Sequence, residues 1–305
     1  MKIVFMGTPD YATEILKELF TCKEIEVSLL VTQPDKPVGR KQILTPTHTK
    51  NWLLENQKNI PIYQPKTLKT EVAQEYISSF NPDFILVAAY GQILPKAILN
   101  IAPCINLHAS LLPKYRGASP IQAALLNDET YAGVTAMFME EGLDCGDMLG
   151  FSYLKLDEDI KVDVLFEKLS FLAAKLSVKV LKNFENLQAL AQTGAQTSYA
   201  KKITKQDGLV DFTTMSAKEI YIKFRAYDPW PGIYLDSGIK LKQIKICPSK
   251  EGFKAGQIQS LEEGLVLTCK QGALRIEAIQ PPSKKVMSAS EYIHGKRLEI
   301  GTYLV

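Results

Sequence analysis

In the sequence of 305 residues we expect neither an export signal nor a segment that holds the protein in a membrane. Residues 1–5 (MKIVF) lead straight into a strand and have neither the basic lead nor the long apolar stretch of a signal peptide. No apolar run approaches the roughly 20 residues that a transmembrane helix needs. We therefore expect a cytoplasmic protein, and the composition is that of an ordinary globular chain.

Cysteine is scarce, and its positions favour neither a disulfide framework nor a zinc site. The five cysteines are odd in number and scattered, and no two of them form a C-x-x-C pair. Disulfide frameworks belong mainly to small secreted domains with paired cysteines. We expect free thiols that pack as small apolar side chains, and no bound metal. The cysteines are Cys22, Cys104, Cys145, Cys247 and Cys269.

The glycine-rich loops that bind dinucleotides and nucleoside triphosphates are also missing. Gly7 follows the first predicted strand, at residues 3–6, but it stands alone without the G-x-G-x-x-G spacing. The G-x-x-x-x-G-K-[ST] phosphate loop is absent as well. These absences count against a dinucleotide-dependent oxidoreductase. No internal repeat or low-complexity segment is present.

The first half of the chain alternates predicted strands with helices. A strand, a glycine turn and a helix with apolar residues on one face open the chain, and a second strand follows at residues 27–32. Residues 84–89 (FILVAA) are continuously apolar, as is typical of a parallel strand buried on both faces. This order predicts a Rossmann-like α/β domain, with a doubly wound parallel sheet, over residues 1–187.

The second half has a different pattern and a different charge. Residues 188–206 are polar and basic and predict a linker. Residues 207–305 contain short predicted strands at a spacing of about 8–12 residues, which indicates a small β-barrel. Residues 1–187 hold 19 basic and 22 acidic side chains, whereas residues 188–305 hold 17 basic and 11 acidic ones. A basic second half suits a polyanionic partner.

Residues 105–108 (INLH) provide a candidate reactive pair. Their apolar and polar residues alternate, as in a short strand, so Asn106 and His108 project from one face. An amide can donate to a developing oxyanion, and an imidazole can move a proton near neutral pH. The glycine-bounded loop 142–146 can return Asp144 to that pair. Ligands of open α/β sheets bind outside the carboxyl ends of the strands, where these residues fall.

Other interpretations of these residues stay open at this point. A histidine beside a strand is often a satisfied structural residue, and an aspartate between glycines often only makes a turn. Cys145 lies next to Asp144, which permits a rival mechanism with a thiolate nucleophile activated by His108. His48 and His294 are interpreted as surface residues.

Longer motifs resemble a known family. Residues 106–113 (NLHASLLP) and 115–122 (YRGASPIQ) resemble the signature of the formyltetrahydrofolate-dependent formyltransferases, and residues 142–144 (GLD) resemble their catalytic aspartate loop. Further stretches narrow the resemblance to the branch that formylates initiator methionyl-tRNA, and together the motifs cover essentially the whole chain. These stretches are 5–10, 32–40, 89–96, 224–231 and 284–289.

The resemblance implies a reaction and a set of partners. The formyl group of 10-formyltetrahydrofolate would move to the α-amine of initiator methionyl-tRNA for translation initiation, with Asn106, His108 and Asp144 as catalytic residues. Neither a metal nor a covalent intermediate would be needed. The second domain, residues 207–305, would be an oligonucleotide-binding-type β-barrel that binds tRNA. We expect a monomer.

The resemblance also implies binding residues. Ser110, Leu111, Leu112 and Pro113 match the folate-contact motif, while Leu86 and Tyr90 match the wall of the pterin pocket; the apolar ones can equally serve only the core. Residues 33–49 predict a long basic loop, which by itself could be merely solvated. In the family this loop lies along the tRNA acceptor stem, Arg40 matches its key arginine, and Lys41 follows. Residues 116–117 predict a plain turn without a chemical role.

Two alternatives to this function remain. A related formyltransferase could act on a small amine, such as an amino sugar nucleotide, although the basic loop and residues 284–289 count against it. A non-catalytic RNA-binding protein with a degenerate enzyme domain is the other, and the intact Asn106, His108 and Asp144 count against that one.

Overall fold

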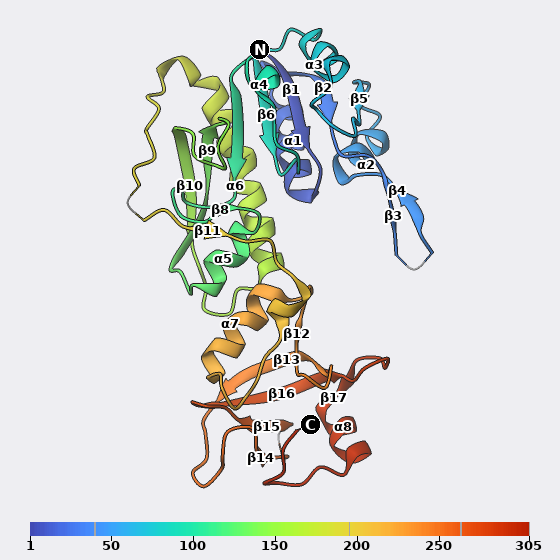
Figure 1. Ribbon diagram of the computed structural model, residues 1–305, viewed down its shortest axis with the longest axis vertical. Coiled ribbons are helices and arrows are strands. Elements are labelled where there is room, and N and C mark those ends of the chain that lie inside the picture. Colours follow the sequence, from blue (N-terminus) through green and yellow to red (C-terminus); the bar gives the residue numbers. More distant parts are fainter. Residues whose placement is uncertain (40, 195, 263, 305) are drawn as a thin grey trace. The chain divides into compact units, whose positions relative to one another are not determined.

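The computed structural model describes residues 1–39, 41–194, 196–262 and 264–304, and the chain divides into two compact units (Figure 1). Unit 2 contains the last third of the chain together with two short segments that precede it in the sequence. None of the helices in the described residues is long and apolar enough to cross a membrane. Unit 1 comprises Met1–Ile121, Thr130–Leu156 and Val164–Lys201; unit 2 comprises Gln122–Glu129, Asp157–Asp163 and Lys202–Val305.

Unit 1 is built on a seven-stranded sheet with the order β10-β9-β7-β6-β1-β2-β5. The strands from β5 to β7 are parallel to their neighbours, whereas β9 and β10 are antiparallel. The parallel, Rossmann-like sheet predicted from the sequence is therefore confirmed, with an antiparallel extension at one edge. The strands are β1 (Lys2–Gly7), β2 (Glu26–Val31), β5 (Ile62–Tyr63), β6 (Phe84–Ala88), β7 (Cys104–His108), β9 (Tyr131–Phe138) and β10 (Met148–Lys155).

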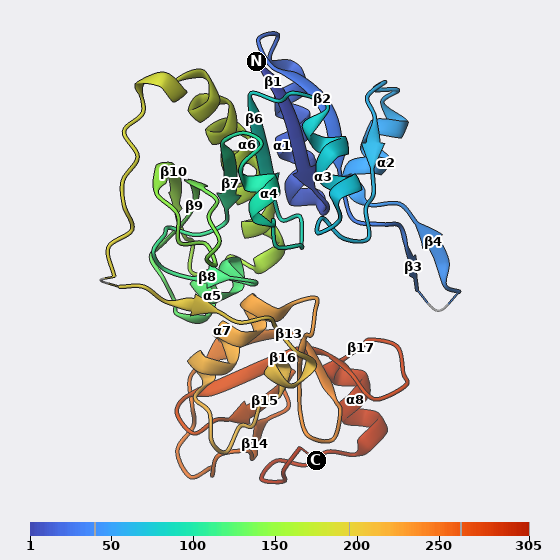
Figure 2. The ribbon, with the colours of Figure 1, turned by 45° about the horizontal axis from the view of Figure 1, so that its top comes forward.

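Helices cover both faces of this sheet, as a doubly wound fold requires. On one face, Ile77 of α3 and Ile98 of α4 share a hydrophobic core with Val4, Ile85 and Val87. Figure 2 shows α3 and α4 on this face of the sheet. On the other face α1 contacts β1, β2 and β6, and it packs against α6 through an aromatic pair. The helices are α1 (Asp10–Thr21), α2 (His48–Glu55), α3 (Glu71–Ser78), α4 (Lys96–Leu99), α5 (Pro120–Leu126) and α6 (Val162–Lys182).

The segment 33–49 is not the continuous loop that its proline and glycine content predicted. β3 (Lys36–Val38) pairs with β4 (Ile43–Thr45) in an antiparallel hairpin that projects from unit 1, and α2 already begins at His48 (Figure 1). Pro37 fits because a strand in a two-stranded ribbon has one unpaired side, where the missing N–H costs nothing. Arg40 lies outside the described residues.

Unit 2 contains an antiparallel sheet with the order β12-β13-β16-β15-β14, and β17 pairs with β16. The small second β domain is confirmed; its closure into a barrel stays a prediction, because no recorded pair joins β12 to β14 in the described residues. β17 and α8 were not predicted from the sequence, although Ser288 and Glu291 form a capping box. The elements are α7 (Ala217–Tyr227), β12 (Ile233–Tyr234), β13 (Lys240–Cys247), β14 (Ile258–Ser260), β15 (Leu265–Thr268), β16 (Ala273–Gln280), β17 (Met287–Ser288) and α8 (Ala289–Lys296).

Two short strands of unit 1 were also unexpected. β8 (Arg116–Gly117) and β11 (Tyr199–Ala200) pair in parallel, and this pairing ties the end of the expected linker to the segment that follows β7. Tyr199 and Ala200 of the expected linker are therefore hydrogen-bonded within unit 1 rather than forming a free connection. Two 3-10 turns, Phe184–Asn186 and Lys205–Gly208, flank it.

Candidate active site

β7 places Asn106 and His108 at the carboxyl end of a central strand. The two side chains are only 9% and 6% exposed, and Ile105 and Leu107 are buried as well. The sequence pattern of alternating residues had suggested one core face and one open face. Because helices cover both faces of this sheet, all five residues of β7 are buried instead. The candidate reactive groups therefore lie in a partly dehydrated environment, where electrostatic interactions are strong.

The structure brings Asp144 to this pair, as the loop 142–146 predicted. Asp144 Oδ2 lies 3.6 Å from His108 Nδ1, and Asp144 Oδ1 lies 3.5 Å from Asn106 Nδ2. Both distances are longer than the roughly 2.7–3.2 Å usual for N–H···O hydrogen bonds, so the three groups converge without a short hydrogen bond between them. A shorter bond comes from the backbone N–H of Gly117, which donates to Asp144 Oδ2 at 2.8 Å. The prediction that residues 116–117 form a plain turn is thus incomplete, since their backbone orients the carboxylate.

The ring of His108 is oriented by a backbone carbonyl. His108 Nε2 lies 2.9 Å from the oxygen of Tyr115. A carbonyl oxygen only accepts, so Nε2 carries a proton in this contact, and Nδ1 is the nitrogen that faces Asp144. The tautomer is therefore set by Tyr115, a residue to which the sequence alone assigned no such task. Tyr115 itself has a positive φ of 60°.

The segment after β7 is held by Thr135 of β9. Thr135 Oγ1 donates to the oxygen of Ser110 at 2.7 Å and accepts from the backbone N–H of Leu112 at 3.1 Å. Ser110 and Leu112 are buried, while Leu111 and Pro113 are half-buried. Ser110 Oγ donates to the oxygen of Lys114 at 2.7 Å, which closes the turn. Thr135 was missed because a threonine inside a strand carries no distinctive sequence signal.

Two family profiles match the chain. The profile described as "Formyl transferase" matches residues 1–181, more than half of the chain. The chain belongs to the formyl transferase family. A second profile, "Formyl transferase, C-terminal domain", matches residues 202–297.

Relatives that are at least 50% identical to this chain match it over almost the full length of both proteins. The protein named "Methionyl-tRNA formyltransferase" of a Nitratiruptor species is 54% identical over 302 residues, which cover 99% of both chains. The protein of the same name from Wolinella succinogenes is 50% identical over 305 residues, which cover 100% of this chain and 99% of its own.

Solved structures share the formyl transferase fold at low identity. The N-formyltransferase from Helicobacter canadensis, in complex with folinic acid and dTDP-3-aminofucose, has a TM-score of 0.66 at 15% identity and matches 90% of this chain and 98% of its own. HypX from Aquifex aeolicus, in complex with tetrahydrofolic acid, has a TM-score of 0.64 at 15% identity and matches 100% of this chain and 51% of its own. At such identity the likeness supports the fold alone.

Leu86 and Tyr90, which are expected to form the wall of the pterin pocket, are both buried. Leu86 is fully buried in β6, and Tyr90 is 2% exposed within the core beneath α3 and α4. Burial raises the pKa of Tyr90, and its hydroxyl has no hydrogen-bond partner among the described residues. The backbone oxygen of Tyr90 accepts from Thr8 Oγ1 at 3.2 Å and from Gln33 Nε2 at 3.1 Å. The expected folate contacts of both residues stay predictions.

The residues expected to contact tRNA lie on or near the hairpin. Lys41 is exposed in its turn, and Arg40 lies outside the described residues. The base of the hairpin is anchored by Lys50 Nζ, which donates to Asp35 Oδ2 at 2.6 Å and to Gln64 Oε1 at 2.8 Å. Hydrogen bonds from Gln64 and Lys50 lower the pKa of Asp35.

Two other features do not contribute to the site. Within the described residues, the recorded partners of the His108 ring are Asp144 and Tyr115, so the geometry offers no support for a Cys145 thiolate activated by His108.

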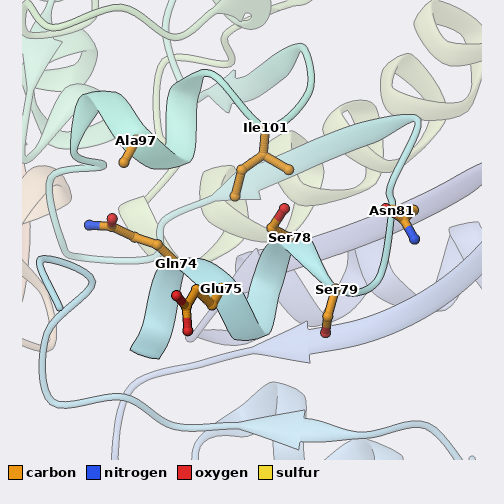
Figure 3. Close-up of a pocket in the computed structure, with 7 residues that line it drawn as sticks. All are labelled: Gln74, Glu75, Ser78, Ser79, Asn81, Ala97 and Ile101. Atoms are coloured by element: carbon orange, nitrogen blue, oxygen red, sulfur yellow. The ribbon is translucent and has the colours of Figure 1, made fainter. Parts of the chain in front are cut away.

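A hollow of about 480 Å³ beside α3 and α4 contains none of the candidate catalytic residues (Figure 3). Its lining is Gln74, Glu75, Ser78, Ser79, Asn81, Ala97 and Ile101.

Proposed function

We propose that this formyl transferase moves the formyl group of 10-formyltetrahydrofolate to the α-amine of initiator methionyl-tRNA. The observation that carries the proposal is the convergence of Asn106, His108 and Asp144 at the carboxyl end of β7. Full-length relatives at 50–54% identity bear the name methionyl-tRNA formyltransferase, which supports tRNA as the acceptor. A cytoplasmic location and a monomeric state stay predictions.

The three side chains fit the chemistry of formyl transfer. When the amine attacks the formyl carbon, a C–N bond forms, negative charge gathers on the formyl oxygen, and the amine must lose a proton. The amide of Asn106 can donate to that oxygen, and a preorganised donor of this kind contributes about 10²–10³ in rate. Asp144, alone or together with His108 Nδ1, can take the amine proton. The proton can then pass to the folate nitrogen as its bond to the formyl carbon breaks.

The binding roles follow the family motifs. We assign folate contacts to Ser110, Leu111, Leu112 and Pro113, with Leu86 and Tyr90 behind them. Arg40 and Lys41 are assigned to the tRNA. We also propose a functional division of the chain, in which residues 1–187 carry the chemistry, residues 188–206 connect, and residues 207–305 bind tRNA through charge. The exposed lysines of the basic half are suitable phosphate neighbours. They include Lys201, Lys202, Lys205, Lys284 and Lys285.

An amino sugar nucleotide is the competing acceptor, since the solved structure from Helicobacter canadensis holds dTDP-3-aminofucose. The decisive experiment supplies labelled 10-formyltetrahydrofolate to initiator methionyl-tRNA, elongator methionyl-tRNA and an amino sugar nucleotide in parallel. We expect label transfer to the initiator methionyl-tRNA and little to the other two. Transfer to the sugar nucleotide alone would refute tRNA as the substrate.

A further inference from the structure

Gln192 connects two loops of the candidate active site that are distant in the sequence. Its Nε2 donates to the backbone oxygens of Asp144 at 3.0 Å and of Gly146 at 2.8 Å. Its Oε1 accepts from Arg116 Nε at 3.1 Å and from Arg116 Nη2 at 2.7 Å. A carboxamide has two N–H donors and two acceptor lone pairs, so these four contacts with oxygen and nitrogen match its full capacity. Met137 Sδ lies farther from Nε2, at 3.9 Å. The side chain is therefore held in one orientation.

The segment that carries Gln192 is itself fastened on both sides. Leu190 exchanges two backbone hydrogen bonds with Met148, at 2.8 and 2.9 Å. Ser198 accepts from the backbone N–H of Arg116 at its oxygen and from that of Tyr115 at Oγ, each at 2.9 Å. Leu190 and Ser198 thus connect the start of β10, just after the Asp144 loop, to the turn that contains Arg116.

Asp144 requires such support because of its backbone conformation. Its φ is +48°, in the left-handed region, which residues other than glycine adopt uncommonly, although aspartate does so more often than most. A residue keeps this conformation only where its surroundings determine it strongly. Gln192 holds the backbone oxygen of Asp144, and the N–H of Gly117 holds its carboxylate. Fixing both ends of the residue aims the carboxylate at Asn106 and His108.

We propose that Gln192, braced by Arg116, is a positioning residue that sets the geometry of the Asp144 carboxylate for formyl transfer. The proposal rests on the proposed function, because it gives Asp144 the catalytic role assigned above. Neither residue touches the reacting atoms in this scheme. Their effect is transmitted through the Asp144 loop, where a displacement of about 1 Å can cost about 10² in rate.

The test compares kcat for wild type, Gln192→Ala and Gln192→Glu with initiator methionyl-tRNA. The alanine removes all four contacts. The glutamate retains an oxygen that can accept from Arg116, but its second oxygen replaces the N–H donor and repels the carbonyl oxygens of Asp144 and Gly146. We expect both variants to lose about 10- to 100-fold in kcat, with the KM values for folate and tRNA changed by less than about threefold. Gln188→Ala, an exposed glutamine of the same segment, is the matched control and should leave kcat unchanged.

A double-mutant cycle separates positioning from general damage to the fold. If Gln192 acts through Asp144, the Asp144→Ala/Gln192→Ala enzyme should have the same kcat as Asp144→Ala alone. Independent, multiplying losses would overturn the proposal, and so would wild-type kcat in Gln192→Glu. Full activity of Asp144→Ala would refute the catalytic role that the proposed function gives to Asp144. Loss of activity in Asp144→Ala together with wild-type kcat in Gln192→Ala would refute only the positioning role of Gln192.

Discussion

The hydroxyl of Thr135 is predicted to be a main support of the folate-contact segment. It is 1% exposed and lies opposite His108 in the pairing of β7 with β9. Thr135→Val keeps the shape of the side chain but removes both hydrogen bonds, which leaves the oxygen of Ser110 and the N–H of Leu112 buried without this partner. An unsatisfied buried polar group costs about 1–3 kcal/mol, so we expect the free energy of unfolding to fall by about 2–6 kcal/mol. That is a large part of the roughly 5–15 kcal/mol typical of a domain.

Urea unfolding followed by tryptophan fluorescence measures this loss. A Trp230→Phe background leaves Trp52, in unit 1, as the single reporter. Thr135→Ser is the matched control, because it keeps the hydroxyl and loses only a methyl group, worth about 1 kcal/mol. The folate dissociation constant should rise in the valine variant, since the backbone of residues 110–113 loses its anchor. Equal stability of the valine and serine variants would refute the reasoning.

Three further predictions concern catalysis, tRNA binding and pH. Alanine at Asn106, His108 or Asp144 should lower kcat by about 10²–10⁴ in chains whose circular dichroism is unchanged, and full activity of His108→Ala would remove its catalytic assignment. Lys284→Ala/Lys285→Ala should flatten the dependence of tRNA affinity on salt in a log–log titration, whereas an unchanged slope would place the phosphate contacts elsewhere. Because the pKa of Asp35 is lowered in the folded state, its stabilising contribution is present above about pH 4 and is lost as the pH falls through the folded pKa. Asp35→Asn should therefore lower stability at pH 7 and weaken the acid-induced loss below pH 4, as thermal midpoints across pH would show.

The sequence by itself determined the central strands of unit 1 and the identity of the candidate reactive residues. Continuous apolar runs predict β1 and β6, which are buried on both faces, because a parallel strand between two helix layers has no solvent side. The family motifs pointed to Asn106, His108 and Asp144, and the structure brings the three together. Composition was a weaker guide for the segment 33–49, where a hairpin forms despite its proline and glycine.

Only the tertiary structure decided which groups hold those residues in place. Gln192 is 48 positions from Asp144 and 76 from Arg116, and no local pattern connects residues so far apart. Thr135 acts through its hydroxyl, whose partner depends on the pairing of β7 with β9. Tyr115 acts through its backbone carbonyl, whose partner depends on a left-handed turn. The periodicity of apolar residues in the sequence predicts which face of a helix or strand is buried, because residues close together along the chain make up that face. Hydrogen bonds between loops depend on where each loop ends in space, and this is settled only when the whole sheet has assembled.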